Sequence, residues 1–126
     1  MCATISPPIS IAVDLKKYRL RIHKSTLHLL GDPKYVQLLV SPDHTMVAIR
    51  SVEYQRAGDQ SHRINQRMMA SDNSIEIYSR LFTEMLLSVA GQLDTKKVYR
   101  LTGRVFSEQG AALFPLRSIE AIEDMR

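Results

Sequence analysis

The stretch KYRLRIH, residues 17–23, decides the expected fold class, because its polarity changes at every residue. In an extended chain Tyr18, Leu20 and Ile22 share one face, and every second residue points to the opposite face. That opposite face is basic and consists of Lys17, Arg19, Arg21 and His23. A period of two is typical of a half-buried strand. We therefore predict a strand here, with one side against a core and a cationic side toward solvent.

Further strands are predicted on both sides of this one. The segments rich in β-branched and aromatic residues are 9–13, 35–40, 46–52, 98–106 and 111–116. Two short links, 41–45 and 107–110, contain the turn formers Pro, Asp and Gly, which indicates hairpins. Pro115 has no N–H to donate, which favours an edge position for the last of these strands.

Helical periodicity appears after residue 73. Asn73 and Glu76 have the spacing of a capping box. The apolar residues that follow recur at helical spacing, namely Ile75, Tyr78, Phe82, Met85 and Val89. Gly91 can stop the helix, so we predict one long amphipathic helix at about 74–90. A shorter helix is expected at about 25–30, before Gly31.

Together these elements predict an α+β fold, with a small antiparallel sheet or partial barrel built from two helix-plus-hairpin halves. All 126 residues fit one domain. The halves, about 9–53 and 74–118, each have a helix that ends at a glycine and is followed by two strands, which predicts two pseudo-repeats. The polar segment 54–73 is predicted to be the exposed connector between them. Because helix-plus-hairpin units are common, a single unduplicated unit is the alternative.

The composition is that of a globular domain, with 44% hydrophobic and 24% charged residues. No apolar run is long enough to span a membrane, and no basic residue precedes an apolar stretch at the N-terminus. We therefore expect no membrane partner and no secretory signal. The single cysteine, Cys2, forms no internal disulfide, which favours a reducing, cytoplasmic location.

The net charge of +4 is unevenly distributed. Residues 1–67 contain ten Lys and Arg against five Asp and Glu, whereas residues 68–126 contain seven against eight. Side chains two apart on a strand are separated by roughly 7 Å, so the basic face of 17–23 forms a row of cations that can follow a phosphate backbone. The candidate nucleic-acid-binding residues are this row, its neighbour and the connector arginines: Lys17, Arg19, Arg21, His23, Lys24, Arg56, Arg63 and Arg67. The alternative is that the row is the solvated face of an amphipathic strand, with charges that discourage edge pairing.

Motifs for catalysis, metal binding or a cofactor are not found in the sequence. The four histidines lack the i, i+4 spacing of a helical zinc pair. Cys2 lies in a proline-flanked tail that suggests no base partner, and the five glycines stand singly rather than in a phosphate-binding loop. We therefore expect no metal, no cofactor and no enzymatic role.

Residues 20–50, LRIHKSTLHLLGDPKYVQLLVSPDHTMVAIR, resemble the swapped-hairpin DNA-binding domains of the AbrB, SpoVT and MazE type. That family has a basic first strand, a short helix ending in Leu-Gly and then a hairpin that completes an intertwined barrel. Leu30-Gly31 fits the helix end, and Lys17, Arg19 and Arg21 fall on the strand that such proteins turn toward DNA. If the second half is a diverged copy, the chain resembles the MraZ proteins, which carry two such units.

Two functional hypotheses follow. The first is a cytoplasmic, regulator-like protein that binds DNA through its basic strand face. The second is a non-enzymatic protein–protein interaction or assembly module that uses a sheet edge or the long helix and binds no nucleic acid. In both cases we expect a homo-oligomer, because hairpin sheets leave exposed strand edges.

Overall fold

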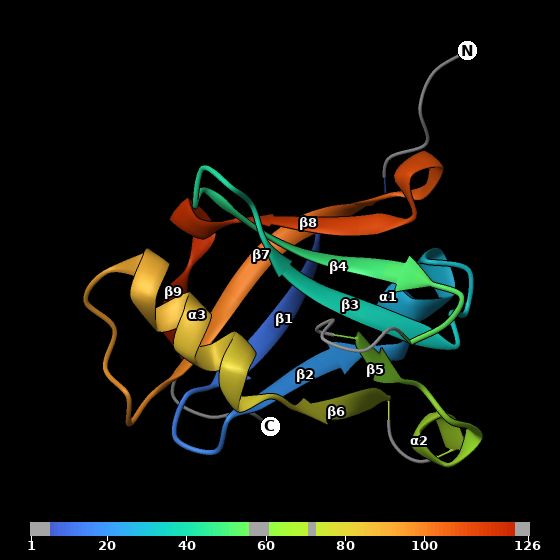
Figure 1. Ribbon diagram of the computed structural model, residues 1–126, viewed down its shortest axis with the longest axis horizontal. Helices are drawn as coiled ribbons and strands as arrows, with labels where there is room; N and C mark the ends of the chain where they lie inside the picture. Colours follow the sequence, from blue (N-terminus) through green and yellow to red (C-terminus); the bar gives the residue numbers. More distant parts are fainter. Residues whose placement is uncertain (1–5, 56–60, 71–72, 123–126) are drawn as a thin grey trace.

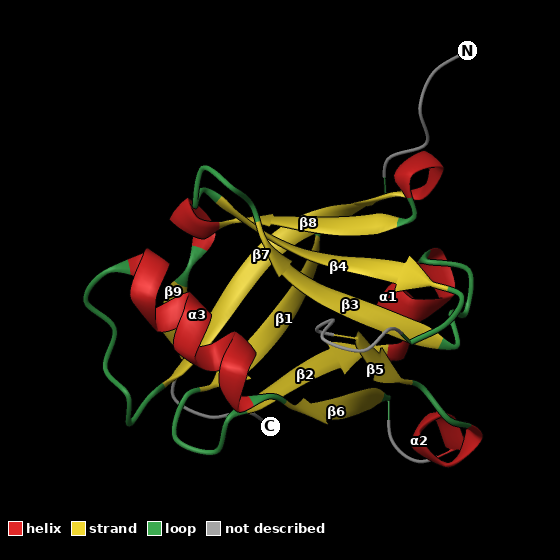
Figure 2. Cartoon of the chain, viewed as in Figure 1, coloured by secondary structure: helices red, strands yellow, loops and turns green. Residues whose placement is uncertain are grey.

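The computed structural model describes residues 6–55, 61–70 and 73–122. Within these residues nine strands form one antiparallel sheet that curls into a nearly closed barrel around a single core (Figures 1 and 2). This confirms the predicted α+β class and the partial barrel. No helix in the described ranges is long and apolar enough to cross a membrane.

The elements alternate along the chain, with short helices inserted between strands. The strands are β1 (Ile9–Asp14), β2 (Arg19–His23), β3 (Tyr35–Val40), β4 (Met46–Val52), β5 (Ser61–Arg63), β6 (Ser74–Tyr78), β7 (Val98–Phe106), β8 (Ala111–Pro115) and β9 (Glu120–Ile122). The α-helices are α1 (Lys24–Leu29), α2 (Gln66–Ala70) and α3 (Arg80–Ala90). The sheet order is β5-β3-β4-β8-β7-β1-β2-β6, and β9 pairs with β7. The strands predicted at 35–40, 46–52 and 98–106 have those bounds in the structure.

The long strand β7 bends the sheet into a barrel. Its residues 98–103 pair with β1, and its residues 104–106 pair with β8. Gly103 lies where the two pairings meet, and a Cβ placed on it would be only 2.0 Å from the carbonyl oxygen of Leu113. No other residue type fits there, so this glycine allows the β8 backbone to approach β7 closely.

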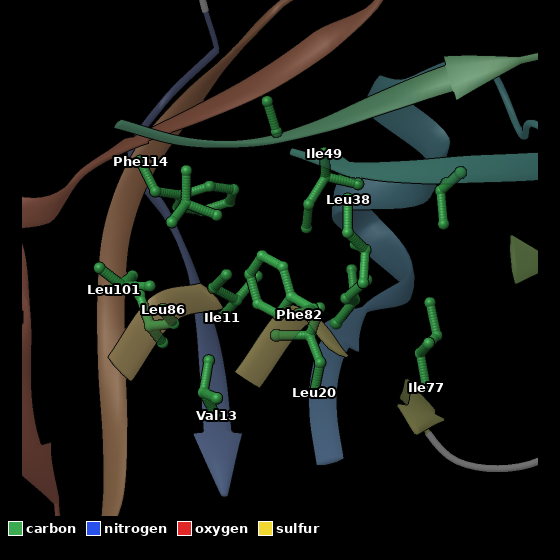
Figure 3. Close-up of a cluster of buried hydrophobic side chains, with 14 of the residues drawn as sticks. Ile11, Val13, Leu20, Leu38, Ile49, Ile77, Phe82, Leu86, Leu101 and Phe114 are labelled. Atoms are coloured by element: carbon green, nitrogen blue, oxygen red, sulfur yellow. The ribbon is translucent and has the colours of Figure 1, made fainter. Parts of the chain in front are cut away.

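The core is built from inward-facing strand residues and one face of α3. Figure 3 shows Phe82 and Leu86 of α3 among the side chains of strand residues such as Ile11 and Leu20. All four are at most 2% exposed. Burial of an aliphatic or aromatic side chain of this size contributes about 2–3 kcal/mol relative to leaving it in water, so α3 is a major part of the core.

The predicted helix at 74–90 begins later than its sequence pattern suggests. Residues 74–78 form β6, with Ile75 and Ile77 facing the core and the full strand paired with β2. The helix starts at Arg80, and its N-cap is Ser79, whose Oγ accepts a hydrogen bond from the Phe82 N–H at 3.1 Å. The capping box at Asn73 and Glu76 was a wrong prediction. Over five residues the pattern Ser-Ile-Glu-Ile-Tyr also has a period of two, and pairing with β2 decides between the alternatives.

Two other differences concern turns and edges. The strand predicted from residue 17 begins at Arg19, because Tyr18 adopts a left-handed backbone conformation with φ of 53° and ends the preceding turn. The edge position expected from Pro115 is wrong, because β8 lies between β4 and β7. The proline is tolerated since β7 pairs with β8 only as far as Leu113.

The described residues 61–70 of the segment 54–73 contain regular structure. Within it β5 pairs with β3, and α2 packs against β6. Ser61 of β5 is buried. The predicted connector therefore adds a strand to the barrel.

The strand pairing is symmetric between the two halves of the chain. Strand β2 pairs with β6, and β4 pairs with β8, while β3 and β7 lie on the outer sides of β4 and β8. Each half has the same order of strand, helix, strand and strand. A duplicated unit would produce this pattern, so the two pseudo-repeats stay a prediction that the topology accommodates.

Candidate functional site

Arg19 and Arg21 lie on the outer face of β2, where they form ion pairs. Nη1 of Arg19 is 2.9 Å and Nη2 of Arg21 is 3.0 Å from the same carboxylate oxygen, Oε2 of Glu76. Nη2 of Arg19 also lies 3.4 Å from Oδ2 of Asp14. Register explains the contacts, because Glu76 on β6 is directly opposite Arg21, and Asp14 on β1 is directly opposite Arg19.

These pairs offset the charges of the two arginines in the predicted cationic row. The guanidinium groups of Arg19 and Arg21 on β2 face two carboxylates, Asp14 on β1 and Glu76 on β6. Elsewhere in the sheet, Arg100 on β7 pairs with Glu120 on β9 at 2.6 Å. Partly buried guanidinium groups held by carboxylates have little excess charge to offer a phosphate. The sequence pattern missed this because it assigned Glu76 to a helix rather than to the strand beside β2.

The other predicted site residues do not converge on one surface. Lys17 is exposed in the turn before β2, and His23 is exposed at the far end of that strand. The backbone N–H of Lys24, the first residue of α1, donates to Asn73 O at 2.9 Å. Arg63 and Arg67 are exposed on β5 and α2, which lie toward the His23 end of β2 rather than the Lys17 end (Figure 1). Arg56 lies outside the described residues.

A different set of cations does gather at one end of the sheet. Antiparallel pairing places Asp14, the last residue of β1, opposite Val98, the first residue of β7. Lys16-Lys17 follow β1 and Lys96-Lys97 precede β7, so the register brings the two lysine pairs to the same end of the sheet. The β1–β2 turn and the loop before β7 lie next to each other at the lower left of Figure 1. All four side chains are exposed. Among the residues that the structure describes, no carboxylate forms an ion pair with them.

Each lysine pair is held by a turn of similar design. Oδ1 of Asp14 accepts the backbone N–H groups of Lys16 and Lys17 at 3.1 and 3.2 Å. Oδ1 of Asp94 accepts the N–H of Lys96 at 2.9 Å, and the Asp94 carbonyl accepts the N–H of Lys97. An aspartate that bonds backbone N–H groups two and three residues ahead fixes a turn, so both pairs project from defined positions.

The start of α3 adds aromatic surface and a fifth cation to this end. The Ser79 N–H donates to the Tyr18 carbonyl at 2.9 Å, which fastens α3 to the β1–β2 turn. The Arg80 guanidinium lies 5.2 Å from the centre of the Tyr18 ring, a cation–π contact. Tyr18, Tyr78 and Leu81 are 38%, 61% and 60% exposed.

We call this surface the basic end and define it as Lys16, Lys17, Arg80, Lys96 and Lys97 with Tyr18 and Tyr78. Five cations there face three nearby carboxylates of the described residues: Asp14 and Asp94, which hold the two turns, and Glu84, which lies 3.3 Å from Arg80. Glu123 and Asp124 follow β9 in the sequence and lie outside the described residues. Three of the five exposed large hydrophobic side chains of the described residues, Tyr18, Tyr78 and Leu81, cluster at this end. The basic end therefore combines positive charge with flat apolar surface.

Away from the basic end, the described residues form an apolar groove. A groove of about 320 Å³ between the α1–β3 loop and α2 is lined mainly by apolar side chains, including Leu27, Ile64 and Met69. Burial lowers the pKa of His62 on β5, so its imidazole is neutral at physiological pH. In the described ranges no three His, Cys, Asp or Glu side chains gather in a way that could hold a metal ion.

Comparisons with protein-family models, curated proteins and solved structures found no match. The resemblance of residues 20–50 to AbrB-type domains stays a prediction.

Proposed function

We propose that this protein binds nucleic acid and that the basic end makes the principal phosphate contacts. The supporting observation is the pairing of Asp14 with Val98, which brings two lysine pairs from opposite halves of the chain to one surface. Exposed ammonium groups without carboxylate partners release counterions when they meet phosphates, and this release drives binding. Arg19 and Arg21 adjoin this surface but are held by Glu76 and Asp14, so their contribution is secondary.

The test is a titration of fluorescein-labelled oligonucleotides with the full chain, followed by anisotropy over a range of NaCl concentrations. Five cations predict a slope of log K against log [NaCl] no steeper than about −3.5 for a single strand and about −4.5 for a duplex. The double substitution Lys16→Gln/Lys17→Gln should reduce the single-strand slope by about 1.4. Absence of binding at low salt would contradict the proposal.

Lys34→Gln is the matched control, since Lys34 is exposed in the loop between α1 and β3, across the molecule from the basic end (Figure 1). This change should leave both affinity and slope unaltered. Equal losses for Lys34→Gln and for the double substitution would indicate diffuse attraction to the whole surface and refute a site at the basic end.

Glu76→Gln tests whether the face of β2 takes part. This change removes the carboxylate shared by Arg19 and Arg21. A clear rise in affinity would indicate that the strand face contacts phosphate once its charge is released, whereas an unchanged affinity supports the basic end alone.

A second candidate function is assembly through a strand edge. The sheet path ends at β5 and β6, and outside its pairing with β2 no backbone hydrogen bond of residues 74–78 is found among the described residues. An open edge of this kind can add a strand from another chain. Light scattering after size-exclusion chromatography distinguishes the candidates, because a stable oligomer that fails to bind any oligonucleotide would favour assembly.

A further inference from the structure

We infer that the nucleic acid bound at the basic end is single-stranded and that one of its bases stacks on Tyr78. This inference rests on the proposed function. It concerns the class of nucleic acid, which the lysines alone do not determine because they attract any phosphate chain.

Tyr78 is placed to receive a flat ligand. It is the last residue of β6, where Ile77 faces the core and Tyr78 therefore faces outward. Its side chain is 61% exposed, and among the described residues no ring contact or side-chain hydrogen bond involves it. Its neighbour in register is Arg19, whose guanidinium is held by Glu76 and Asp14. The Tyr78 ring thus lies at the border between the ion-paired face of β2 and the basic end.

Tyr18 lies beside this position but differs in its surroundings. The Arg80 guanidinium covers one face of the Tyr18 ring, and the Tyr18 carbonyl is bonded to Ser79, the residue that follows Tyr78. The two tyrosines are consequently held close together by backbone contacts. Tyr78 is the more exposed ring, and Tyr18 with Arg80 forms an adjoining flat surface with a positive charge.

The positive charge of the lysines and the exposed rings of the tyrosines together determine which ligand fits the basic end. A partner must carry repeated negative charge to match the lysines and must present flat π surfaces to cover the tyrosines. A single strand offers both, because its unpaired bases are free to stack on aromatic side chains. A duplex presents the same phosphates but keeps its bases stacked inside, and a polyanion such as heparin has no aromatic rings.

The experiment compares four probes under one salt condition: oligo(dT), oligo(U), a DNA duplex of equal length and heparin. We expect oligo(dT) to bind about tenfold or more tightly than the duplex, since stacking on an aromatic side chain contributes on the order of 1–3 kcal/mol per base. Tyr78→Ala should lower the affinity for oligo(dT) about tenfold without changing the salt slope, because no charge is removed. Tyr78→Phe keeps the ring and should retain the affinity.

Tyr54→Ala is the matched control, since Tyr54 is 58% exposed and follows β4, whose C-terminal end lies across the barrel from the β1–β2 turn (Figure 1). It should bind oligo(dT) like the unchanged protein.

Tryptophan fluorescence gives a direct readout of stacking, because the chain contains no tryptophan of its own. In Tyr78→Trp the single indole should be quenched by oligo(dT) and not by heparin.

The results distinguish failure of base stacking on Tyr78 from failure of nucleic-acid binding itself. Equal affinities for oligo(dT) and duplex, with no effect of Tyr78→Ala, would overturn the inference while nucleic-acid binding stands. Heparin binding as tight as oligo(dT), again insensitive to Tyr78→Ala, would also overturn it and indicate a general polyanion site. No binding to any nucleic acid would overturn both the proposed function and the inference.

Discussion

Tyr18 occupies a backbone conformation that bulky residues rarely adopt. Its φ of 53° lies in the left-handed region, where an L-residue with a large side chain costs roughly 1–2 kcal/mol. The conformation turns the chain between β1 and β2 and presents the ring to Arg80. An asparagine would satisfy the turn with less strain. The turn by itself therefore does not explain why residue 18 is a tyrosine.

Tyr18→Asn should therefore separate stability from binding. We expect the free energy of unfolding to stay constant or to rise by up to about 1 kcal/mol, because the strain is relieved and the lost ring is partly exposed. The affinity for oligo(dT) should fall. Urea denaturation and anisotropy measure the two quantities, and a marked loss of stability would instead assign the ring a structural role.

Gly103 is fixed by close backbone approach rather than by its φ angle. A Cβ at this position would lie 2.0 Å from Leu113 O and 2.8 Å from a Phe114 ring carbon. We expect Gly103→Ala to destabilise the protein by about 3 kcal/mol or more, since the β7–β8 ladder must shift to admit the methyl group. Thermal and urea denaturation would detect this loss.

The control for Gly103 is Gly31→Asn. Gly31 has a positive φ of 87°, but a Cβ there meets no atom within 4 Å. Asparagine tolerates left-handed backbone better than other residues, so the cost should stay below about 1 kcal/mol. Equal losses at the two positions would argue against a steric origin for the Gly103 effect.

At the scale of elements, β6 and α3 act as one unit. Five residues of β6 complete the sheet beside β2, a single residue follows, and α3 then brings Phe82 and Leu86 into the core. The change from strand to helix depends on Ser79, which is extended in its backbone and caps the helix with its side chain. Without this switch the continuous helical spacing from 75 to 89 would favour one longer helix, as the sequence pattern predicts.

Ser79→Ala should reduce the free energy of unfolding by about 1 kcal/mol, because the Phe82 N–H loses its buried acceptor. Ser88→Ala is the matched control, as Ser88 lies on the exposed side of the same helix and its Oγ donates to the Met85 carbonyl. Its effect should stay below about 0.5 kcal/mol. Urea denaturation of both variants makes the comparison, and equal effects would argue against a capping role.

For the whole molecule, the arrangement of charge depends on which strands pair. The sequence places its basic excess in residues 1–67, yet the pairing of β1 with β7 adds Lys96 and Lys97 from the other half to Lys16 and Lys17. Conversely, Arg19 and Arg21 on β2 are paired with Asp14 on β1 and with Glu76 on β6, and Glu76 is 55 residues distant from Arg21 in the chain. Proximity in the sheet, not in the sequence, determines which cations keep their charge available.

If the two lysine pairs form one site, their contributions to binding should combine. Lys17→Gln and Lys97→Gln should each reduce the single-strand salt slope by about 0.7 and the double variant by about 1.4. Anisotropy titrations over a NaCl series provide the slopes. A loss confined to Lys17→Gln would mean that Lys97 lies outside the binding surface and would contradict the definition of the basic end.

The sequence by itself determined the elements whose patterns are local. Alternating and β-branched segments predicted β1, β3, β4, β7 and β8 to within a residue, and Gly31 and Gly91 marked the ends of helices, because strand periodicity and left-handed turns depend on a few adjacent residues. The α+β class and the partial barrel followed from those elements.

Only the tertiary structure decided the features that require a partner strand. The pattern at 74–78 fits both helix and strand, and β2 resolved it in favour of the strand. The same pairing placed Arg19 and Arg21 of the predicted cationic row against Glu76, and the pairing of β1 with β7 created a basic end that no contiguous stretch contains. Electrostatic interactions act through space over a few ångströms, so the charge of a surface follows from the fold rather than from the order of residues.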